Sequence, residues 1–351
     1  MFIIHELQGA FSYEGIYMAI KSLTKFFSST PIMLMLRIGK LTKETCRTGF
    51  VLTAISEGIY DIMQSEPVAF EKIQKFFKSD FNPEGLRAWL DLGVSLGELK
   101  KNTNGYSIKV KLSKELIKPA NDTWRAFLQV RVEVFYDYII NTPSMLKKNM
   151  QFEYNEAHGE LVARSSRTLE PVLLDVADKI IPKNKLYRLL EVGCGSGIYI
   201  KRACELNPLL TAVGLEVQQS VADFARENIK TWNFEDRVEI ENTDIREYEC
   251  KSDFDLVTFY NLIYYFPVDE RIDLLKNLGK HLKPGGELIL TSMCKGNDPS
   301  LNLMNFWTSM TDGYGPLPSP KQIHDQLKKA GYRKIKSEML IPSFVSFRVI
   351  K

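Results

Sequence analysis

The chain has 351 residues, with 46 lysines and arginines against 43 aspartates and glutamates, a formal charge of +3. Its 44% hydrophobic and 25% charged residues are typical of a globular protein and exclude collagen-like, disordered and disulfide-scaffold classes. This length predicts about two domains. The nearly balanced charge neither requires nor excludes a nucleic-acid partner, and no strongly basic tail is present.

The cysteines and the N-terminal segment indicate a cytoplasmic protein. The five cysteines include no C-x-x-C pair, which argues against a zinc site and against a disulfide-stapled secreted fold. His5 and Glu6 stand where a signal peptide would carry basic residues and a long apolar core. The apolar run Ile32–Leu36 is far shorter than the roughly 18 to 20 residues that cross a bilayer. We therefore expect no metal, no membrane partner and free thiols at Cys46, Cys194, Cys204, Cys250 and Cys294.

The first half of the chain, to about residue 150, is predicted to be mainly helical. Val68–Phe77 is expected to form a short amphipathic helix, and Pro83–Gly97 a second one that begins at a proline and ends at a glycine. Tyr106–Leu112 alternates apolar and polar residues, which predicts a strand. Helix, turn, helix and hairpin is the order of a winged helix.

Two longer helices are expected next, Asp122–Ile140, which Thr142-Pro143 would stop, and Gly159–Ile181. From Leu186 onward, apolar strands alternate with helices, and this pattern predicts an α/β doubly wound sheet. The last two strands would form a terminal hairpin. The expected strands are Tyr187–Val192, Leu210–Leu215, Val238–Glu241, Phe254–Tyr260, Glu287–Ser292, Tyr332–Leu340 and Phe344–Ile350.

Residues 189–197, LLEVGCGSG, form the most informative stretch. Glycines between a strand and a helix let the backbone approach a ligand, and the helix N-terminus offers free N–H groups. The dinucleotide pattern G-x-G-x-x-G would need glycine where Ile198 stands, and no G-K-[ST] follows for a P-loop. A carboxylate at Glu191 would repel a pyrophosphate. It suits a ligand that carries an ammonium group and ribose hydroxyls.

Acidic residues at the ends of the next two strands fit the same ligand. Glu216 follows the second strand, where a carboxylate can accept hydrogen bonds from both ribose hydroxyls. Asp244 follows the third strand and could accept from an adenine amino group, while Ile245 packs on the ring. Asn261 follows the fourth strand and is a further candidate contact for the cofactor.

Together these segments resemble class I S-adenosylmethionine-dependent methyltransferases. They occur in the family's order: EVGCGSG, the strand ends at Glu216 and Asp244, FDLV and LKPGG. The resemblance implies a Rossmann-like seven-stranded sheet with its last strand antiparallel, and S-adenosylmethionine as cofactor. It also implies that the methionine part of the cofactor is lined by Gly193, Gly195 and Gly197.

The N-terminal half is similar to the winged-helix dimerisation region of small-molecule O-methyltransferases, in FVLTAISEGIYDIMQ and in WLDLGVSLGELKKNTNGYSI. The segment LPSPKQIHDQLKKAGY resembles the one that these enzymes place after their substrate loop. The resemblance implies a small-molecule acceptor and a homodimer. Residues 1–150 would form the dimerisation and substrate-lid domain, and residues 151–351 the cofactor domain.

One position departs from that family's pattern. Its histidine base lies in a segment of the form L-H-D-W-P, and the matching stretch here, Leu262–Pro267, has Tyr264 in its place. A phenol with an ordinary pKa near 10 is a poor base at neutral pH. A sulfonium is already a good leaving group, and alignment of the acceptor can contribute up to about 7 to 11 kcal/mol. Our hypothesis is that Tyr264 either orients the acceptor or holds a water, with oxygen, nitrogen, carbon and sulfur all open as the acceptor atom.

Several other residues are weaker candidates, because packing or a solvated surface explains them as well. His158 is a second catalytic candidate, and Arg164 could reach the cofactor carboxylate. His281 and His324 are expected on exposed helix faces. The candidates for the substrate pocket are Tyr154, Tyr265, Phe306, Trp307 and Met310.

Other function classes stay open. Winged helices often read DNA, but the helix that would enter the groove has one basic residue, Arg87, against three acidic ones, which favours packing or dimerisation. A base methyltransferase commonly carries [DN]-P-P-[YF] after the fourth strand, and residues 261–264 contain no proline. Protein methylation, a cofactor-sensing regulator and a non-methylating enzyme on this fold are the remaining alternatives.

Overall fold

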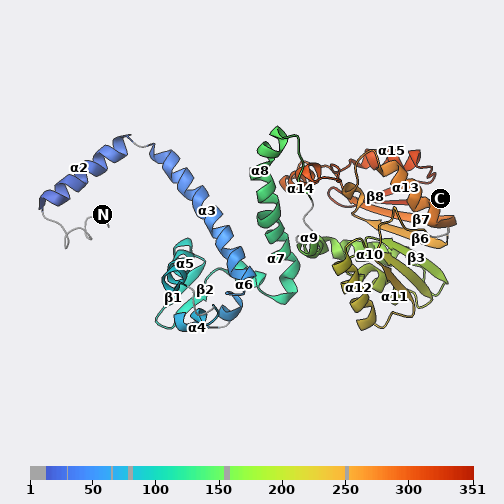
Figure 1. Cartoon of the computed structure of the whole chain (residues 1–351), viewed down its shortest axis with the longest axis horizontal. Helices are drawn as coiled ribbons and strands as arrows, with labels where there is room; N and C mark the ends of the chain where they lie inside the picture. Colours follow the sequence, from blue (N-terminus) through green and yellow to red (C-terminus); the bar gives the residue numbers. More distant parts are fainter. Residues whose placement is uncertain (1–12, 30, 65, 78–81, 154–158, 250–252) are drawn as a thin grey trace. The chain divides into compact units, whose positions relative to one another are not determined.

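The computed structural model describes residues 13–29, 31–64, 66–77, 82–153, 159–249 and 253–351. The chain separates into two compact units, Met1–Asn121 and Asp122–Lys351. Each unit is described by itself (Figure 1). The division into a dimerisation and substrate-lid domain, residues 1–150, and a cofactor domain, residues 151–351, stays a prediction.

The N-terminal unit carries the expected order of helix, helix and hairpin. The helix α5 begins where the Asn82 Oδ1 accepts a hydrogen bond from the Gly85 N–H, at 3.0 Å, and it ends at Gly97, whose φ is +84°. This is the proline start and glycine end that the sequence predicts. The elements of this unit are α2 (Tyr13–Ser29), α3 (Ile32–Ser56), η1 (Asp61–Met63), α4 (Phe70–Gln74), α5 (Pro83–Leu96), β1 (Leu99–Asn102), β2 (Gly105–Ile108), α6 (Lys111–Leu116) and η2 (Pro119–Asn121).

Two predicted elements of this unit are shorter in the structure. The expected helix Val68–Phe77 shrinks to α4, because the Val68 N–H and carbonyl pair with Tyr106 of the hairpin at 2.8 and 2.9 Å. The expected strand Tyr106–Leu112 ends at Ile108, and α6 begins three residues later. The alternation or spacing of apolar side chains therefore overestimates both elements. The helix is shortened by backbone pairing with the hairpin, and the strand by the start of α6.

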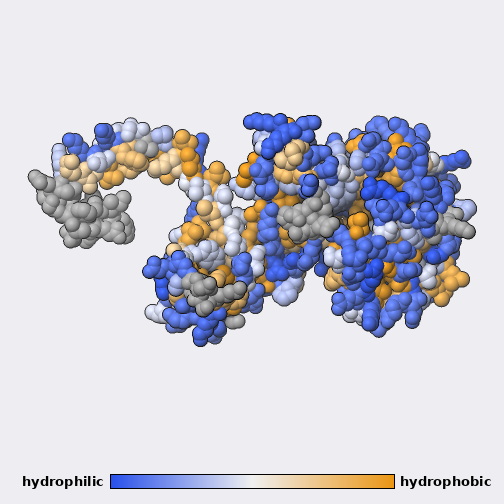
Figure 2. Space-filling model, viewed as in Figure 1, coloured by the Kyte–Doolittle hydropathy of each residue, from blue (hydrophilic) through white to orange (hydrophobic). Residues whose placement is uncertain are grey.

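The helices α2 and α3 expose apolar side chains along much of their length, and white and orange residues follow them in Figure 2. Only the last turns of α3 are buried, where Phe50 stacks on Trp89 of α5 with ring centroids 4.3 Å apart. Among the described residues, no helix is long and apolar enough to cross a bilayer.

The second unit begins with helices that differ in extent from the predicted ones. A π-helix interrupts the first. Pro143 lies inside α8 and does not stop it; in the turn before it the Thr142 hydroxyl donates to the Tyr138 carbonyl at 2.6 Å. The second predicted helix is divided by a 3-10 turn, Arg167–Leu169, and Pro171 lies in the first turn of the helix that follows it. The elements are α7 (Asp122–Gln129), the π-helix η3 (Val130–Phe135), α8 (Tyr136–Lys147), α9 (Gly159–Ser166), η5 (Arg167–Leu169) and α10 (Glu170–Ile180).

A seven-stranded sheet follows, in the order β5-β4-β3-β6-β7-β9-β8. The first five of these strands are parallel, and β9 runs antiparallel to β7 and β8, so the predicted sheet with an antiparallel last strand is confirmed. The strand β7 begins earlier than predicted, because Leu282 already pairs with Phe254. The strands are β3 (Tyr187–Val192), β4 (Leu210–Leu215), β5 (Val238–Glu241), β6 (Phe254–Tyr260), β7 (Leu282–Met293), β8 (Lys336–Ile341) and β9 (Phe344–Ile350).

Alternate side chains of each strand enter two cores, one on each face of the sheet. Leu189 lies in the core covered by α10, α11 and α12, and Leu190 in the core covered by α13 and α15. Strand order reverses between β3 and β6, which is where ligands of open α/β sheets bind, at the carboxyl ends of the strands. The remaining helices are α11 (Ile198–Leu206), α12 (Gln219–Thr231), η6 (Ile263–Tyr265), α13 (Arg271–His281), α14 (Pro299–Met310) and α15 (Pro320–Lys329).

The two C-terminal histidines differ. His324 is half-exposed, as predicted. The prediction that His281 is solvated is wrong: the side chain is 2% exposed and its ring lies 5.3 Å from that of Tyr248. The reason is that α13 passes directly into β7 at Leu282, so its last residue lies against the sheet.

Candidate functional site

The glycine loop joins β3 to α11 and has the conformation that its glycines allow. Gly193, Gly195 and Gly197 all have positive φ angles, of +65°, +54° and +77°. A Cβ at Gly193 would come within 2.5 Å of Leu262, whereas one at Gly195 would meet nothing within 4 Å. The loop is therefore closed on the side of Leu262 and open to a ligand at Gly195.

The Glu191 carboxyl lies beneath this loop with an unmatched oxygen. The side chain is 2% exposed, and its Oε2 has no hydrogen-bond partner among the described residues. The Thr258 hydroxyl, on the residue that pairs with Glu191 across β3 and β6, also has none there. Burial raises the pKa of Glu191 well above its ordinary value. A buried carboxyl of this kind fits the ammonium group that the sequence predicts as its partner.

This pKa predicts that binding of the cofactor releases a proton. With its pKa raised by burial, Glu191 holds a proton in the free protein at pH values above the ordinary pKa of a glutamate, and a neighbouring ammonium would lower that pKa and expel the proton. Calorimetry of S-adenosylmethionine binding in two buffers of different ionisation enthalpy should show release of up to about one proton. Glu191→Gln should abolish that difference. Equal heats in both buffers for the unaltered protein would contradict the placement of Glu191.

The Glu216 carboxylate lies at the end of β4, beside the glycine loop. Its Oε2 accepts a hydrogen bond from the Gly195 N–H at 3.1 Å, and its Oε1 accepts one from the Gln218 N–H at 3.1 Å. Burial raises the pKa of this carboxyl, and the backbone donors act in the opposite direction. The structure thus brings together Gly195 and Glu216, which the sequence placed at one ligand.

Asp244 and Ile245, which follow β5, already have partners within the protein. Burial favours a higher pKa for Asp244, but its hydrogen bonds and ion pair with Arg246, at 2.7 Å, hold that pKa below the ordinary value. Ile245 is 3% exposed and packs in the core with Val192. Their expected contacts with adenine stay predictions, and a ligand amino group at Asp244 would compete with Arg246.

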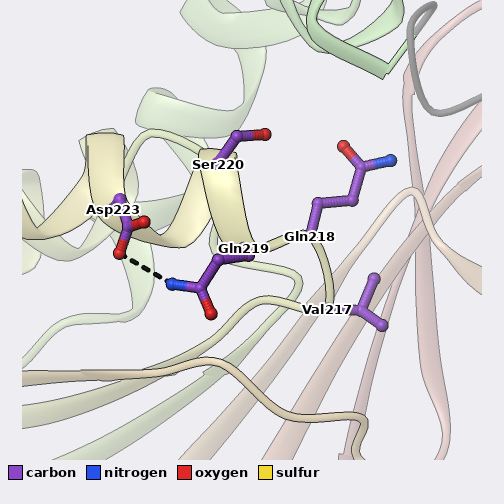
Figure 3. A pocket seen from close by; sticks show the side chains of 5 residues that line it. All are labelled: Val217, Gln218, Gln219, Ser220 and Asp223. Carbon is purple, nitrogen blue, oxygen red and sulfur yellow. Dashed lines mark hydrogen bonds between the residues drawn. The ribbon is translucent and has the colours of Figure 1, made fainter.

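A hollow of ≈ 480 Å³ adjoins Glu216 at the start of α12 (Figure 3). Gln219 donates to Asp223, one turn later in α12, at 2.8 Å. Gly159, at the start of α9, lies so close to Gln218 that a Cβ there would come within 2.5 Å. The sequence analysis missed these residues, although their position directly after Glu216 was a usable signal. The lining residues are Val217, Gln218, Gln219, Ser220 and Asp223.

Tyr264 and Asn261 lie after β6, at the other side of the glycine loop. Tyr264 is 2% exposed and makes a hydrogen bond with the Asn261 side chain. Asn261 has a φ of +61°, and its Oδ1 accepts from the Met293 N–H at 2.9 Å. Burial raises the pKa of Tyr264 well above 10, so its phenol stays protonated at neutral pH. This agrees with the argument that Tyr264 is no general base.

Four of the predicted substrate residues form one aromatic cluster with η3 and α8. Trp307 lies 6.2 Å from Tyr265 and 5.5 Å from Phe135, between ring centroids. Tyr265 lies 5.0 Å from Tyr264. Met310 is buried in this cluster and Phe306 packs against it. The other candidates, Tyr154 and His158, lie outside the described residues.

Arg164 is held by an acidic side chain. Its guanidinium donates to both carboxylate oxygens of Asp122, which also pairs with Arg125. The hydrogen bonds from Arg164 hold the pKa of Asp122 below its ordinary value. The expected contact of Arg164 with a cofactor carboxylate stays a prediction.

Arg271 is a site residue that the sequence analysis missed. It is 2% exposed, and it donates to the carbonyls of Phe266, at 3.0 Å, and Pro316, at 2.9 Å. The Gly315 N–H also donates to the Tyr264 carbonyl at 3.0 Å. These bonds join the loop that carries Tyr264 to the loop after α14. An arginine in an amphipathic helix gives no sequence signal for such burial.

Comparisons with known proteins agree with this geometry. Residues 190–288 match a family model described as a methyltransferase domain. The chain is 24% identical over 196 residues to demethylspheroidene O-methyltransferase of Rhodobacter capsulatus, over 54% of this chain and 47% of that protein. The chain spans about half the length of the curated relatives it matches.

Two solved structures have the same fold over nearly the whole chain. Mitomycin 7-O-methyltransferase MmcR is similar with a TM-score of 0.73 at 14% identity, over 91% of this chain and 98% of that chain. Human N-acetylserotonin methyltransferase, in complex with SAM, is similar with a TM-score of 0.63 at 16% identity, over 92% and 99%. Residues 190–288 therefore match a methyltransferase domain, and the chain has the fold of these two solved structures.

Proposed function

We propose that the chain transfers a methyl group from S-adenosylmethionine to a small-molecule acceptor. The observation that carries the proposal is the pair of carboxyls at the glycine loop. Glu191 is buried with an unmatched oxygen that fits an ammonium, and Glu216 lies where ribose hydroxyls can reach it. Bound S-adenosylmethionine would supply an electrophilic methyl group on a sulfonium.

The protein's own residues would bind the cofactor and align the acceptor. Gly193, Gly195 and Gly197 would let the backbone approach the methionine part, with Asp244 and Ile245 at the adenine. The aromatic cluster beside Tyr264 would exclude water and hold an apolar acceptor. Because the phenol stays protonated, Tyr264 would donate a hydrogen bond and position the acceptor, and alignment would provide most of the rate.

A Tyr264→Phe variant tests this role. Loss of one positioning hydrogen bond, worth about 0.5 to 1.5 kcal/mol, should lower methyl transfer from labelled cofactor about two- to tenfold. The dissociation constant for S-adenosylmethionine should not change. Tyr136→Phe, at an exposed tyrosine of α8, is the matched control and should transfer at the normal rate. Unchanged transfer by the Tyr264 variant would remove Tyr264 from the mechanism.

Choice of cofactor is the direct test of the site. Isothermal titration should show binding of S-adenosylmethionine and of S-adenosylhomocysteine, and none of NAD, because Glu191 would face the pyrophosphate of a dinucleotide. Binding of NAD without binding of S-adenosylmethionine would replace the proposal with a dehydrogenase-like or regulatory function.

The structure weakens one alternative, a DNA-binding regulator. Arg87, the one basic residue of α5, lies over the Phe70 ring at 3.9 Å from its centroid, and the acidic side chains of that helix remain. This packing holds the one basic side chain of the helix against Phe70, so the helix presents few groups that read bases. Methylation of a protein or a nucleic acid remains the second candidate, and the recipient of labelled methyl decides it.

We also propose a homodimer formed through α2 and α3. Apolar side chains 37% to 70% exposed follow both helices, and an apolar surface of this extent marks an interface. A second copy of the chain has the same apolar surface, and we propose that this copy covers it. Sedimentation should show a dimer that Phe26→Glu with Leu34→Glu dissociates, and a monomer for the unaltered chain would contradict this. The exposed residues are Tyr17, Met18, Ile20, Leu23, Phe26, Phe27, Met33, Leu34, Met35, Leu36, Ile38 and Leu41.

A cytoplasmic location is proposed on the state of the thiols. The four described cysteines are free, and three of them are buried in the sheet unit. Free buried thiols fit a reducing compartment.

A further inference from the structure

One half-buried arginine of the second unit leaves most of its guanidinium donors without a partner among the described residues. Arg131 lies in the π-helix η3, donates to the Phe127 carbonyl at 2.7 Å, and stacks over the Phe127 ring at 3.2 Å from its centroid. None of the ion pairs among the described residues includes it. Burial lowers its pKa to about 10, because removal from water disfavours the charged form.

Two other arginines of this unit are paired with an acid, whereas Arg271, also without one, gives its Nε–H and Nη2–H to the carbonyls of Phe266 and Pro316. Arg125, six residues earlier on α7, pairs with Asp122, and Arg164 of α9 donates to the same carboxylate. Both charges are therefore matched within the unit. Among the described residues, the partners of the Arg131 guanidinium are the Phe127 carbonyl and the Phe127 ring. A half-buried guanidinium costs free energy unless an anion binds it, and π-helices occur often at functional sites.

The position of Arg131 connects it with the aromatic cluster. Val130 and Val134, on either side of it, are buried there with Trp307 and Met310. Phe135 follows Arg131 by four residues, which places both on one side of the helix, and its ring lies 5.5 Å from Trp307. Through Trp307 and Tyr265 the cluster continues to Tyr264, beside the glycine loop.

The guanidinium is also preorganised for a planar anion. The Phe127 ring fixes its plane, and the bond to the Phe127 carbonyl uses one Nη1–H. The Nε–H and Nη2–H edge makes no hydrogen bond with the described residues. That edge has the spacing of a carboxylate and binds it through two parallel hydrogen bonds.

We infer that Arg131 recognises a carboxylate on the methyl acceptor, so that the substrate is a small aromatic or otherwise apolar acid. Its apolar body would lie on the cluster of Phe135, Trp307 and Tyr265, with its acidic group at Arg131. This inference rests on the proposed methyl transfer, because it names the acceptor of that reaction. The anion site itself can be tested without turnover.

The first test measures binding of a matched pair of probes, 2-naphthoate and its neutral analogue 2-naphthamide, to protein saturated with S-adenosylhomocysteine. A charge-assisted bidentate contact should make naphthoate bind about ten- to a hundredfold tighter than naphthamide. Arg131→Gln should remove that preference. Arg131→Lys should restore part of it, since a lysine keeps the charge but not the planar pair of donors.

A second arginine variant separates recognition from net charge. Arg333→Gln, at an exposed position before β8, removes one positive charge far along the chain and should keep the full preference. Equal affinity of the two probes for the unaltered protein, a preference that survives in Arg131→Gln, or no binding of either probe would each overturn the inference.

The second test separates this inference from the proposed function. The unaltered protein is incubated with methyl-labelled cofactor and a cell extract, and the labelled product is passed over an anion exchanger at neutral pH. A retained acidic product supports the inference, and a neutral product overturns it while methyl transfer stands. No labelled small molecule, with the naphthoate preference intact, refutes the proposed function and leaves the anion site.

Discussion

Replacing Glu216 by alanine is expected to weaken binding of S-adenosylmethionine about ten- to a hundredfold, because hydrogen bonds to a charged group contribute roughly 1.5 to 3 kcal/mol. The carboxylate already lies beside the loop, where it accepts from the Gly195 N–H and the Gln218 N–H. Ribose hydroxyls would approach the same two oxygens. Isothermal titration measures the change directly.

Two further variants make that result specific. Glu216→Gln keeps one acceptor oxygen and should lose less affinity than the alanine variant. Glu239→Ala, at an exposed position of the neighbouring strand β5, should bind the cofactor normally. Circular dichroism shows whether each variant is folded. Wild-type affinity in a folded Glu216→Ala protein would mean that this strand end does not hold the ribose.

The second large effect concerns the hairpin of the N-terminal unit. Gly105 has a φ of +121°, and a Cβ there would come within 2.1 Å of the Val68 carbonyl oxygen. An alanine would be strained in that conformation by about 1 to 3 kcal/mol, and it would push apart the backbone pair between Val68 and Tyr106. We expect Gly105→Ala to destabilise the unit by about 3 kcal/mol or more.

Gly97 provides the matched control for that experiment. It also has a positive φ, +84°, but a Cβ there would meet nothing within 4 Å. Gly97→Ala should therefore cost only about 1 to 2 kcal/mol, the strain of the left-handed backbone. Hydrogen exchange of the amides in β1 and β2, read by mass spectrometry, compares the two variants. Equal protection in both variants would show that the close approach of residue 105 to Val68 does not affect the stability of the hairpin.

The cofactor side of the molecule is predictable from sequence because its determinants are local. The glycines at 193, 195 and 197 require positive φ angles, and each strand places its last residue at the carboxyl edge of the sheet. A short pattern therefore fixes both conformation and position. Glu216 lies beside Gly195 for that reason alone.

The rest depends on contacts between distant segments, which no local pattern encodes. His281 is polar and ends a helix, so it looks exposed, yet the chain returns straight into the sheet and buries it. The sequence pattern places Val68 in a helix, but in the structure its backbone N–H and carbonyl are hydrogen-bonded to Tyr106. Arg131 and Arg271 look solvated in sequence, and only the packing of η3 and of the loop at Gly315 buries them.

The most direct test of the central claim follows the methyl group itself. The unaltered protein is incubated with S-adenosylmethionine carrying a labelled methyl and with an extract of the source organism, and label is counted separately in small molecules, protein and RNA. The account predicts label in a small molecule, lost in Glu216→Ala. Label in protein or RNA, or in no fraction although the cofactor binds, would contradict it.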